Sequence, residues 1–121
     1  MRILVVDDDA MMLAAISKKL EEKKYDVSTT TDAVEALQIM SEEKIDLVIS
    51  DVIMPCISGL TFLTMLKNFY YSKVPLILIS SYNQESIVMK AHSLGANYFI
   101  SKPIDYNQLI LKIEEFTSDI S

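Results

Sequence analysis

Four short apolar stretches of this sequence each end in polar or charged side chains. If the stretches are strands of one parallel sheet, their ends meet at the same edge of that sheet, where open α/β folds bind ligands. Several carboxylates, a hydroxyl and an ammonium group would then converge on one site. The four endings are Asp7-Asp8-Asp9, Ser50-Asp51, Ser80-Ser81 and Ser101-Lys102.

Carboxylates brought this close together repel one another unless a cation lies between them. A hard divalent ion suits them because it prefers oxygen ligands, and Mg²⁺ keeps several waters, which leaves room for a phosphate oxygen. With Asp7, Asp8 and Asp51 ionised the site carries three negative charges, which Mg²⁺ and Lys102 together would offset. Any one of these aspartates could equally be a turn former or a helix N-cap. Their joint occurrence at strand ends favours a site that accepts a phosphoryl group.

The apolar stretches alternate with amphipathic segments, which is typical of an α/β fold with a parallel sheet. Buried strands are predicted at residues 3–6, 47–49, 76–79 and 98–100, and a more polar strand at residues 27–30. The polar strand belongs at an edge of the sheet, where one side is open to water. With right-handed crossovers, the order 2-1-3-4-5 meets this condition. We therefore predict a five-stranded parallel sheet flanked by five helices, a doubly wound, flavodoxin-like arrangement.

The helices are predicted from apolar residues that recur every three or four positions. Asp32 with Glu35, and Asp105 with Gln108, have the spacing of a capping box at a helix start. Gly95 has the position of a glycine that ends a helix. In chain order, the apolar positions are Leu13, Ile16 and Leu20; Ala33, Ala36, Leu37 and Met40; Leu60, Leu63 and Leu66; Ile87, Ala91 and Leu94; and Leu109, Ile113 and Phe116.

The composition excludes several function classes. The chain has 121 residues, which is the size of one domain; we place that domain at residues 1–117, and residues 118–121 are a polar tail or a truncated linker. The only glycines are Gly59 and Gly95, so neither a Walker A loop nor a dinucleotide fingerprint can be present. The formal net charge is −6 and the basic residues are scattered, which argues against direct nucleic-acid binding.

Cysteine content and the first residues bear on the compartment. Cys56 is the single cysteine, so no intrachain disulfide and no cysteine-based zinc site can form, as in a reducing compartment. The first apolar stretch ends at Asp7 and is too short for a signal peptide or a membrane span. We therefore expect a cytoplasmic protein that does not contact the membrane.

Short motifs occur along the chain in a specific order and spacing. Together they resemble the receiver domain of two-component response regulators, the CheY-like family, and the resemblance runs from Arg2 to about Phe116. It implies a phosphoacceptor signalling switch of a two-component or phosphorelay system. The motifs are Val5-Val6-Asp7-Asp8-Asp9, Ser50-Asp51-Val52-Ile53-Met54-Pro55 followed by Gly59, Leu78-Ile79-Ser80-Ser81, Gly95-Ala96 and Lys102-Pro103.

The resemblance implies a role for each matching residue at the strand ends. Asp51 would be the phosphoacceptor, a nucleophile that takes the phosphoryl group from a phosphohistidine. Asp8 and Asp51 would bind Mg²⁺ directly together with the backbone carbonyl of Ile53, and Asp7 would act through a metal-bound water. Lys102 would pair with a phosphoryl oxygen.

The resemblance also implies a switch made of Ser80 and Phe99. Ser80 would hydrogen-bond the phosphoryl group, and Phe99 would turn inward as Ser80 moves. The family more often has threonine at the Ser80 position, so this switch is expected to be less constrained. The readout face would be the helix at about residues 84–94, the fifth strand and the last helix. The Lys102–Pro103 bond would be cis.

The implied partners are proteins. A histidine kinase or a histidine phosphotransfer protein would supply the phosphoryl group, and an output domain or target protein would read the result. The resemblance leaves open a homodimer that forms on phosphorylation. The chain would not be an enzyme, because phosphoryl transfer and autodephosphorylation both act on its own aspartate.

Two positions that flank the attacking water in this family are here Ile53 and Tyr82. Both side chains are bulky, and neither is acidic nor amide-bearing. Our hypothesis is that they hinder water entry, so that the phosphoryl group is comparatively long-lived.

Three other functions fit the sequence less well. A phosphatase of the haloacid-dehalogenase type also uses an aspartyl nucleophile with Mg²⁺, but it has an acid two residues later, where this chain has Ile53. A flavodoxin would share the fold, but the acidic loop at Asp7 would repel a flavin phosphate. A receiver-like module that docks without being phosphorylated usually lacks one site residue, whereas this chain keeps the set with serine at position 80.

Overall fold

The computed structural model describes residues 1–54, 57–70 and 73–120 of the chain. Pro55 and Cys56, which the sequence analysis names, lie outside these residues. Strands and helices alternate along the chain, as predicted. The elements are β1 (Arg2–Val6), α1 (Ala10–Glu22), β2 (Asp26–Thr30), α2 (Ala33–Glu42), β3 (Leu47–Asp51), α3 (Gly59–Met65), the π-helical turn η1 (Leu66–Tyr70), β4 (Leu76–Ser80), α4 (Glu85–Ser93), β5 (Tyr98–Ser101) and α5 (Tyr106–Ile120).

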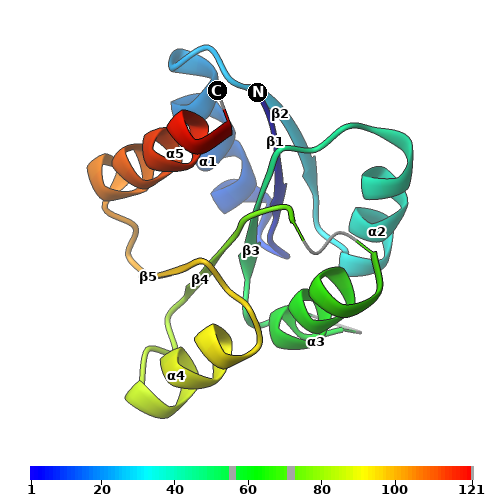
Figure 1. The fold of residues 1–121 in the computed structure, drawn as a ribbon. Coiled ribbons are helices and arrows are strands. Elements are labelled where there is room, and N and C mark those ends of the chain that lie inside the picture. The colour runs from blue at the N-terminus through cyan, green and yellow to red at the C-terminus, as the bar shows by residue number, and fades with distance from the viewer. Residues whose placement is uncertain (55–56, 71–72, 121) are drawn as a thin grey trace.

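The strands form one parallel sheet in the order β2-β1-β3-β4-β5 (Figure 1). This confirms the predicted strand order. β3 and β4 are buried at every position, because helices cover both faces of the sheet. β2 lies at one edge and buries fully only Thr30, which explains its polar sequence.

The helices form two layers, one on each face of the sheet (Figure 1). α1 and α5 pack on one face through a cluster of buried residues that includes Ile16 and Leu109. α2, α3 and α4 cover the other face through a second cluster, which includes Ala36, Phe62 and Ala91. Because both faces are covered by apolar contacts, the strand ends are where this fold places its polar side chains.

The start of α2 corrects one sequence prediction. Asp32 caps the helix, since its Oδ1 accepts a hydrogen bond from the Val34 N–H at 2.9 Å. The N–H of Asp32 donates to Thr30 Oγ1 at 3.1 Å and not to Glu35, as a capping box would require. A hydroxyl from the edge strand thus takes the place of the predicted glutamate.

At the start of α5, too, the aspartate caps the helix but the predicted capping box does not form. Asp105 Oδ1 accepts hydrogen bonds from the N–H groups of Asn107 at 3.0 Å and Gln108 at 3.3 Å. The Gln108 side chain donates to the Tyr98 hydroxyl at 2.9 Å. The aspartate caps the helix as predicted, and the glutamine instead ties α5 to β5.

The ends of α3, α4 and α5 can be compared with the sequence predictions. The helix predicted around residues 60–66 ends at Met65 and continues as the π-helical turn η1. α4 ends before Gly95, as predicted, and the φ of +111° at Gly95 lies in the left-handed region that favours glycine.

α5 continues to Ile120, so residues 118–120 are helical. The predicted end of the domain at residue 117 stays a prediction. No helix in the described part of the chain is long and apolar enough to cross a membrane.

Candidate functional site

Asp7 and Asp51 lie side by side at the carboxyl ends of β1 and β3. Asp7 comes directly after β1 and Asp51 is the last residue of β3, and the two strands are aligned by the pairing of Val6 with Ser50. Asp7 is fully buried, and Asp51 is 6% exposed. Asp8 is exposed, and the carboxylate oxygens of the three aspartates lie within 4.8 Å of one another. The structure thus brings together the three aspartates that the sequence singled out.

Backbone contacts hold Asp7 in this inward position. Its N–H donates to the Thr30 carbonyl at 3.2 Å, and its Oδ1 accepts from the Asp9 N–H at 2.9 Å. Asp9 has a different task, because its Oδ1 accepts from the Met11 N–H at 2.9 Å and caps α1. The alternative role as helix N-cap therefore holds for the third aspartate of the run.

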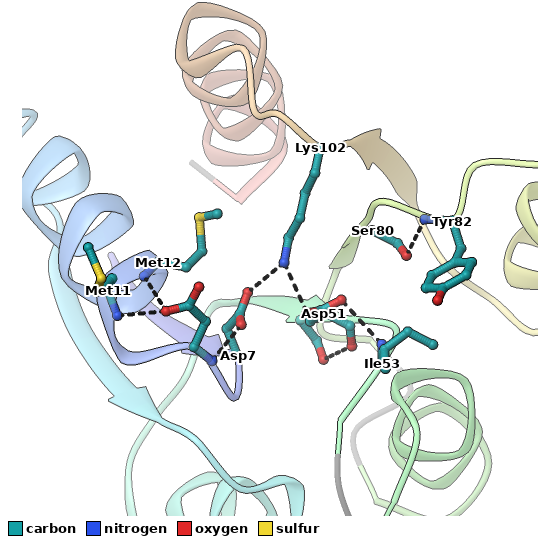
Figure 2. Close-up of polar contacts among 10 residues, drawn as sticks. Asp7, Met11, Met12, Asp51, Ile53, Ser80, Tyr82 and Lys102 are labelled. Carbon is teal, nitrogen blue, oxygen red and sulfur yellow. Dashed lines mark hydrogen bonds and ion pairs between the residues drawn. The ribbon is translucent and has the colours of Figure 1, made fainter.

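Lys102 lies between the two buried aspartates (Figure 2). Its Nζ is 3.0 Å from Asp51 Oδ2 and 3.2 Å from Asp7 Oδ2. A backbone hydrogen bond positions Lys102 beside the end of β4, since its N–H donates to the Ser80 carbonyl at 2.9 Å. The Lys102–Pro103 bond is cis, as the resemblance implies. The sequence predicted that Lys102 offsets the acidic charge, but not that it contacts both carboxylates.

Burial and charge shift the pKa values of this group. Burial is the largest effect on the Asp7 carboxyl and raises its pKa. The hydrogen bond from the Asp9 N–H lowers this pKa by less, the charge of Asp51 adds a smaller rise, and Lys102 has a smaller lowering effect. Burial lowers the pKa of the Lys102 ammonium, but its hydrogen bonds and attraction to Asp51 and Asp7 outweigh this effect, and the pKa is raised. Lys102 therefore stays charged, while Asp7 resists ionisation unless more positive charge arrives.

The group suits a hard divalent cation such as Mg²⁺. It offers three carboxylates with oxygens within 4.8 Å of one another, which is the ligand type such ions prefer. Burial, the largest cause of the raised pKa of Asp7, and the nearby charge of Asp51 both disfavour the ionised carboxylate, and a bound cation would offset both effects. Ile53, whose carbonyl is the predicted fourth ligand, is tied to the site because its N–H donates to Asp51 Oδ1 at 3.2 Å.

The backbone of Asp51 is held by two residues whose contribution the sequence did not reveal. Ser50 is fully buried, and its Oγ donates to the Asp51 carbonyl at 3.0 Å. Gly59, the first residue of α3, lies so close that a Cβ there would be 2.1 Å from the same carbonyl oxygen. Its N–H donates to the Val52 carbonyl at 2.7 Å. Only glycine lets α3 begin directly against the strand that carries Asp51.

The two predicted switch residues lie on the neighbouring strands. Ser80 ends β4, is fully buried, and accepts a hydrogen bond at its Oγ from the Tyr82 N–H at 2.9 Å (Figure 2). This bond directs its hydroxyl toward the loop and not toward the carboxylates. Phe99 lies in β5 opposite Leu78 and packs, half-buried, against the cluster shared by α2, α3 and α4. In the described contacts, neither residue touches the acidic group.

Two bulky side chains stand at the rim of the site. Ile53 and Tyr82 are each 52% exposed. Ile53 follows Asp51 by two residues and Tyr82 follows Ser80 by two, so they rise from the loops after adjacent strands β3 and β4 (Figure 2). The site is thus acidic at its base and apolar on this side of its rim.

Residues 3–114 match the response regulator receiver domain family. This chain belongs to that family. Solved receiver domains have the same fold along nearly the whole chain. A signal receiver domain from Pseudomonas fluorescens is 28% identical, with a TM-score of 0.90 and coverage of 98% of this chain and 94% of that one. A chemotaxis response regulator of Vibrio cholerae is 25% identical, with a TM-score of 0.87 and coverage of 95% and 97%.

Curated relatives of this receiver domain are longer proteins. A two-component response regulator of Arabidopsis thaliana is 36% identical over 111 residues, which cover 90% of this chain and 18% of that protein. A probable transcriptional regulator of Pyropia yezoensis is 30% identical over 110 residues, which cover 90% of this chain and 50% of that protein. The chain thus spans about half the length of the curated relatives it matches, or less. The predicted family and fold are confirmed, and family membership implies phosphoacceptor signalling.

Proposed function

We propose that this receiver domain is the phosphoacceptor switch of a two-component system or phosphorelay, and that Asp51 takes a phosphoryl group from a histidine kinase or a histidine phosphotransfer protein. The placement of Asp51 carries this proposal. It is a nearly buried carboxylate at a strand end, 3.0 Å from the Lys102 ammonium, with two further aspartates beside it.

In the proposed reaction an Asp51 oxygen attacks the phosphorus of a phosphohistidine. An O–P bond forms while the N–P bond breaks, and the electron pair of the broken bond stays on the imidazole nitrogen. The transition state spreads negative charge over three equatorial oxygens, so positioning and electrostatics supply most of the catalysis. Lys102 is within reach of one of these oxygens, and the Ser80 hydroxyl would bind another after releasing the Tyr82 N–H.

Asp8, Asp51 and the Ile53 carbonyl would hold Mg²⁺, with Asp7 acting through a water. When bound, the ion supplies positive charge that stabilises both the carboxylates and the phosphoryl oxygens. The charges at the site support this assignment, because three carboxylates lie close together and the Lys102 ammonium contacts only two of them.

Phosphorylation would change partner binding through the face formed by α4, β5 and α5. Ser80 leads directly into the loop before α4, and Phe99 packs against the cluster beneath that helix. We infer that Phe99 turns inward as Ser80 moves toward the phosphoryl group. On the same face the Tyr98 hydroxyl accepts from Gln108 at 2.9 Å, and Lys112 Nζ lies 4.1 Å from the Tyr98 ring centroid. An output domain, a target protein or a second copy of the domain would bind there.

The proposal includes no reaction on a separate substrate, since transfer and autodephosphorylation both take place at Asp51. It assigns the domain to the cytoplasm, without membrane contact. It also excludes direct nucleic-acid binding by this domain, in keeping with its net charge of −6.

Intact mass after incubation with phosphoramidate, with and without Mg²⁺, tests the proposal. We expect one added phosphoryl group on the wild type only with Mg²⁺, and none on Asp51→Asn. Asp26→Asn, a change of the same chemistry at an exposed position of β2, should behave as wild type. A wild type that takes no phosphoryl group and does not bind beryllofluoride would be a docking module that is never phosphorylated.

A further inference from the structure

The two ends of α4 are held very differently. At its amino-terminal end the cap residue Gln84 makes no side-chain hydrogen bond to the helix, and residues 81–86 are all exposed. Among the residues that the structure describes, one hydrogen bond ties the preceding loop to the sheet, from the Tyr82 N–H to Ser80 Oγ. Few contacts therefore hold this end of the helix in place if Ser80 moves.

The carboxyl-terminal end of α4 is fastened by burial and hydrogen bonds. Ala91 is fully buried and Ala96 is 7% exposed. The Ala96 N–H donates to the Ala91 carbonyl at 3.0 Å, and the Gly95 N–H donates to the His92 carbonyl at 3.1 Å. The Ser93 hydroxyl donates to a carbonyl of the last turn at 2.7 Å. These contacts close the helix end and leave few free backbone groups.

Lys67 joins this end of α4 to the sheet from a third element. It lies in η1, and its Nζ donates to the Val74 carbonyl at 2.7 Å and to Asn97 Oδ1 at 3.1 Å. Asn97 Oδ1 also accepts from the Leu76 N–H at 2.9 Å, and the Asn97 N–H donates to the Leu76 carbonyl at 2.9 Å. One lysine thus connects η1 to the amino ends of both β4 and β5.

The stem of Lys67 also packs against the turn that ends α4. A Cβ at Gly95 would lie 3.0 Å from Lys67 Cγ, so the lysine chain passes directly under the left-handed residue. Burial lowers the pKa of the Lys67 ammonium. Both of its hydrogen-bond acceptors are neutral, so the ammonium is held by fixed dipoles at the edge of the sheet opposite to Asp51.

We propose that Lys67 is a positioning residue that fixes the carboxyl-terminal end of α4 to the amino ends of β4 and β5, so that phosphorylation displaces the amino-terminal end of the helix alone. The helix then moves as a lever about Gly95. Partners that read the signal contact its exposed amino-terminal half. This inference rests on the proposed function of Asp51.

Amide hydrogen exchange in the free and the beryllofluoride-bound protein tests the lever, because exchange reports local opening along the chain. In the wild type we expect exchange to change at residues 81–88 and to stay the same at residues 91–97. Equal changes in both segments would overturn the inference. Intact mass after phosphoramidate treatment separates the two proposals: an adduct with equal changes refutes the lever alone, and a wild type with neither an adduct nor beryllofluoride binding refutes the proposed function and the lever with it.

Lys67→Met keeps the stem that packs against Gly95 and removes both hydrogen bonds of the ammonium. We expect the change caused by beryllofluoride to spread into residues 91–97, with exchange at least about fivefold faster in the bound than in the free variant, since the loss of even one of the two hydrogen bonds gives about this factor. Lys73→Met, at an exposed lysine six residues away, should behave as wild type. Faster exchange of residues 91–97 by the same factor in the free and bound variant would show a purely stabilising lysine and refute the proposal. If the variant does not fold, the wild-type comparison decides alone.

Discussion

The two edges of the sheet each hold a half-buried lysine, in opposite electrical surroundings. At the carboxyl edge Lys102 lies between Asp51 and Asp7, and these carboxylates raise its pKa. At the amino edge Lys67 has a backbone carbonyl and an amide oxygen as acceptors, and burial lowers its pKa. One lysine is therefore held by charge and the other by dipoles.

This difference agrees with the proposed function, which places the reaction at the carboxyl edge and a structural role at the amino edge. At the carboxyl edge three carboxylates lie beside one ammonium, so under the proposed function this edge would attract a cation and, with it, a phosphoryl group. At the amino edge the hydrogen bonds of Lys67 link η1, β4 and β5, which are contacts that a reaction does not change. Under the proposed function, the carboxyl edge changes on phosphorylation and the amino edge keeps its contacts.

The largest expected effect distinguishes the two lysines by activity. Lys102→Met should slow phosphorylation of Asp51 by phosphoramidate by about 10²–10³-fold, the usual loss when one donor to transition-state oxygens is removed. Lys67→Met should leave that rate close to wild type, because Lys67 lies at the other edge. The rates are read from intact mass against time at saturating Mg²⁺. A loss below about tenfold for Lys102→Met would mean that Asp51 does not depend on Lys102 for charge stabilisation.

A second effect concerns the stability of the acidic edge without metal. Because the folded state raises the pKa of Asp7, its contribution to the free energy of unfolding is full below about pH 3.8, the ordinary value, and falls as the pH rises through the folded pKa. Asp7→Asn removes this fall, so the variant should gain stability relative to wild type as the pH rises, by about 1.4 kcal/mol for each pH unit between the ordinary and the folded pKa. Lys102 does not interfere, since its raised pKa keeps it charged throughout.

Urea denaturation in EDTA between pH 4 and 7 measures this difference. The gap between variant and wild type should widen with pH and should close when Mg²⁺ is added, because the ion compensates the charge of Asp7. The exposed Asp26→Asn serves as control and should show no such gap. A gap that is independent of pH would contradict the titration of Asp7 as its origin.

Most of the fold and the charged part of the site could be predicted from the sequence. Apolar stretches that end in Asp7, Asp51 and Lys102 located the strand ends, because burial on both faces leaves a pattern in the chain. The features that could not be predicted depend on which of several possible hydrogen-bond partners a side chain contacts in the folded protein. Gln108 has the spacing of a capping residue but donates to the Tyr98 hydroxyl, since a side chain that the fold brings close can outcompete the local backbone.

Tertiary contacts also explain why the sequence did not reveal the role of Lys67, the π-helical turn and the contact of Gly59 with Asp51. A lysine in a helical pattern usually faces solvent, and its acceptors Val74 and Asn97 are distant in sequence or beyond the helix end. The need for glycine at position 59 arises only when α3 meets the end of β3. Local patterns thus predict elements, whereas the fastening of one element to another depends on tertiary geometry.

The smallest expected effect concerns the apolar rim of the responsive edge. Ile53 and Tyr82 lie two residues after the ends of the neighbouring strands β3 and β4, and each is 52% exposed, and we expect them to hinder water on its way to the phosphoryl group. Replacing them together by polar groups that can orient a water, as Ile53→Asn with Tyr82→Glu, should accelerate autodephosphorylation about tenfold, which corresponds to about 1.4 kcal/mol in the barrier. The measurement is loss of the phosphoryl adduct by intact mass after removal of the donor. Ile53→Leu with Tyr82→Phe, which keeps both side chains bulky and apolar, should dephosphorylate at the wild-type rate. If the polar pair is no faster than this control, the rim does not limit the lifetime of the signal, and that lifetime is set by Asp51, Lys102 and the metal at the base of the site.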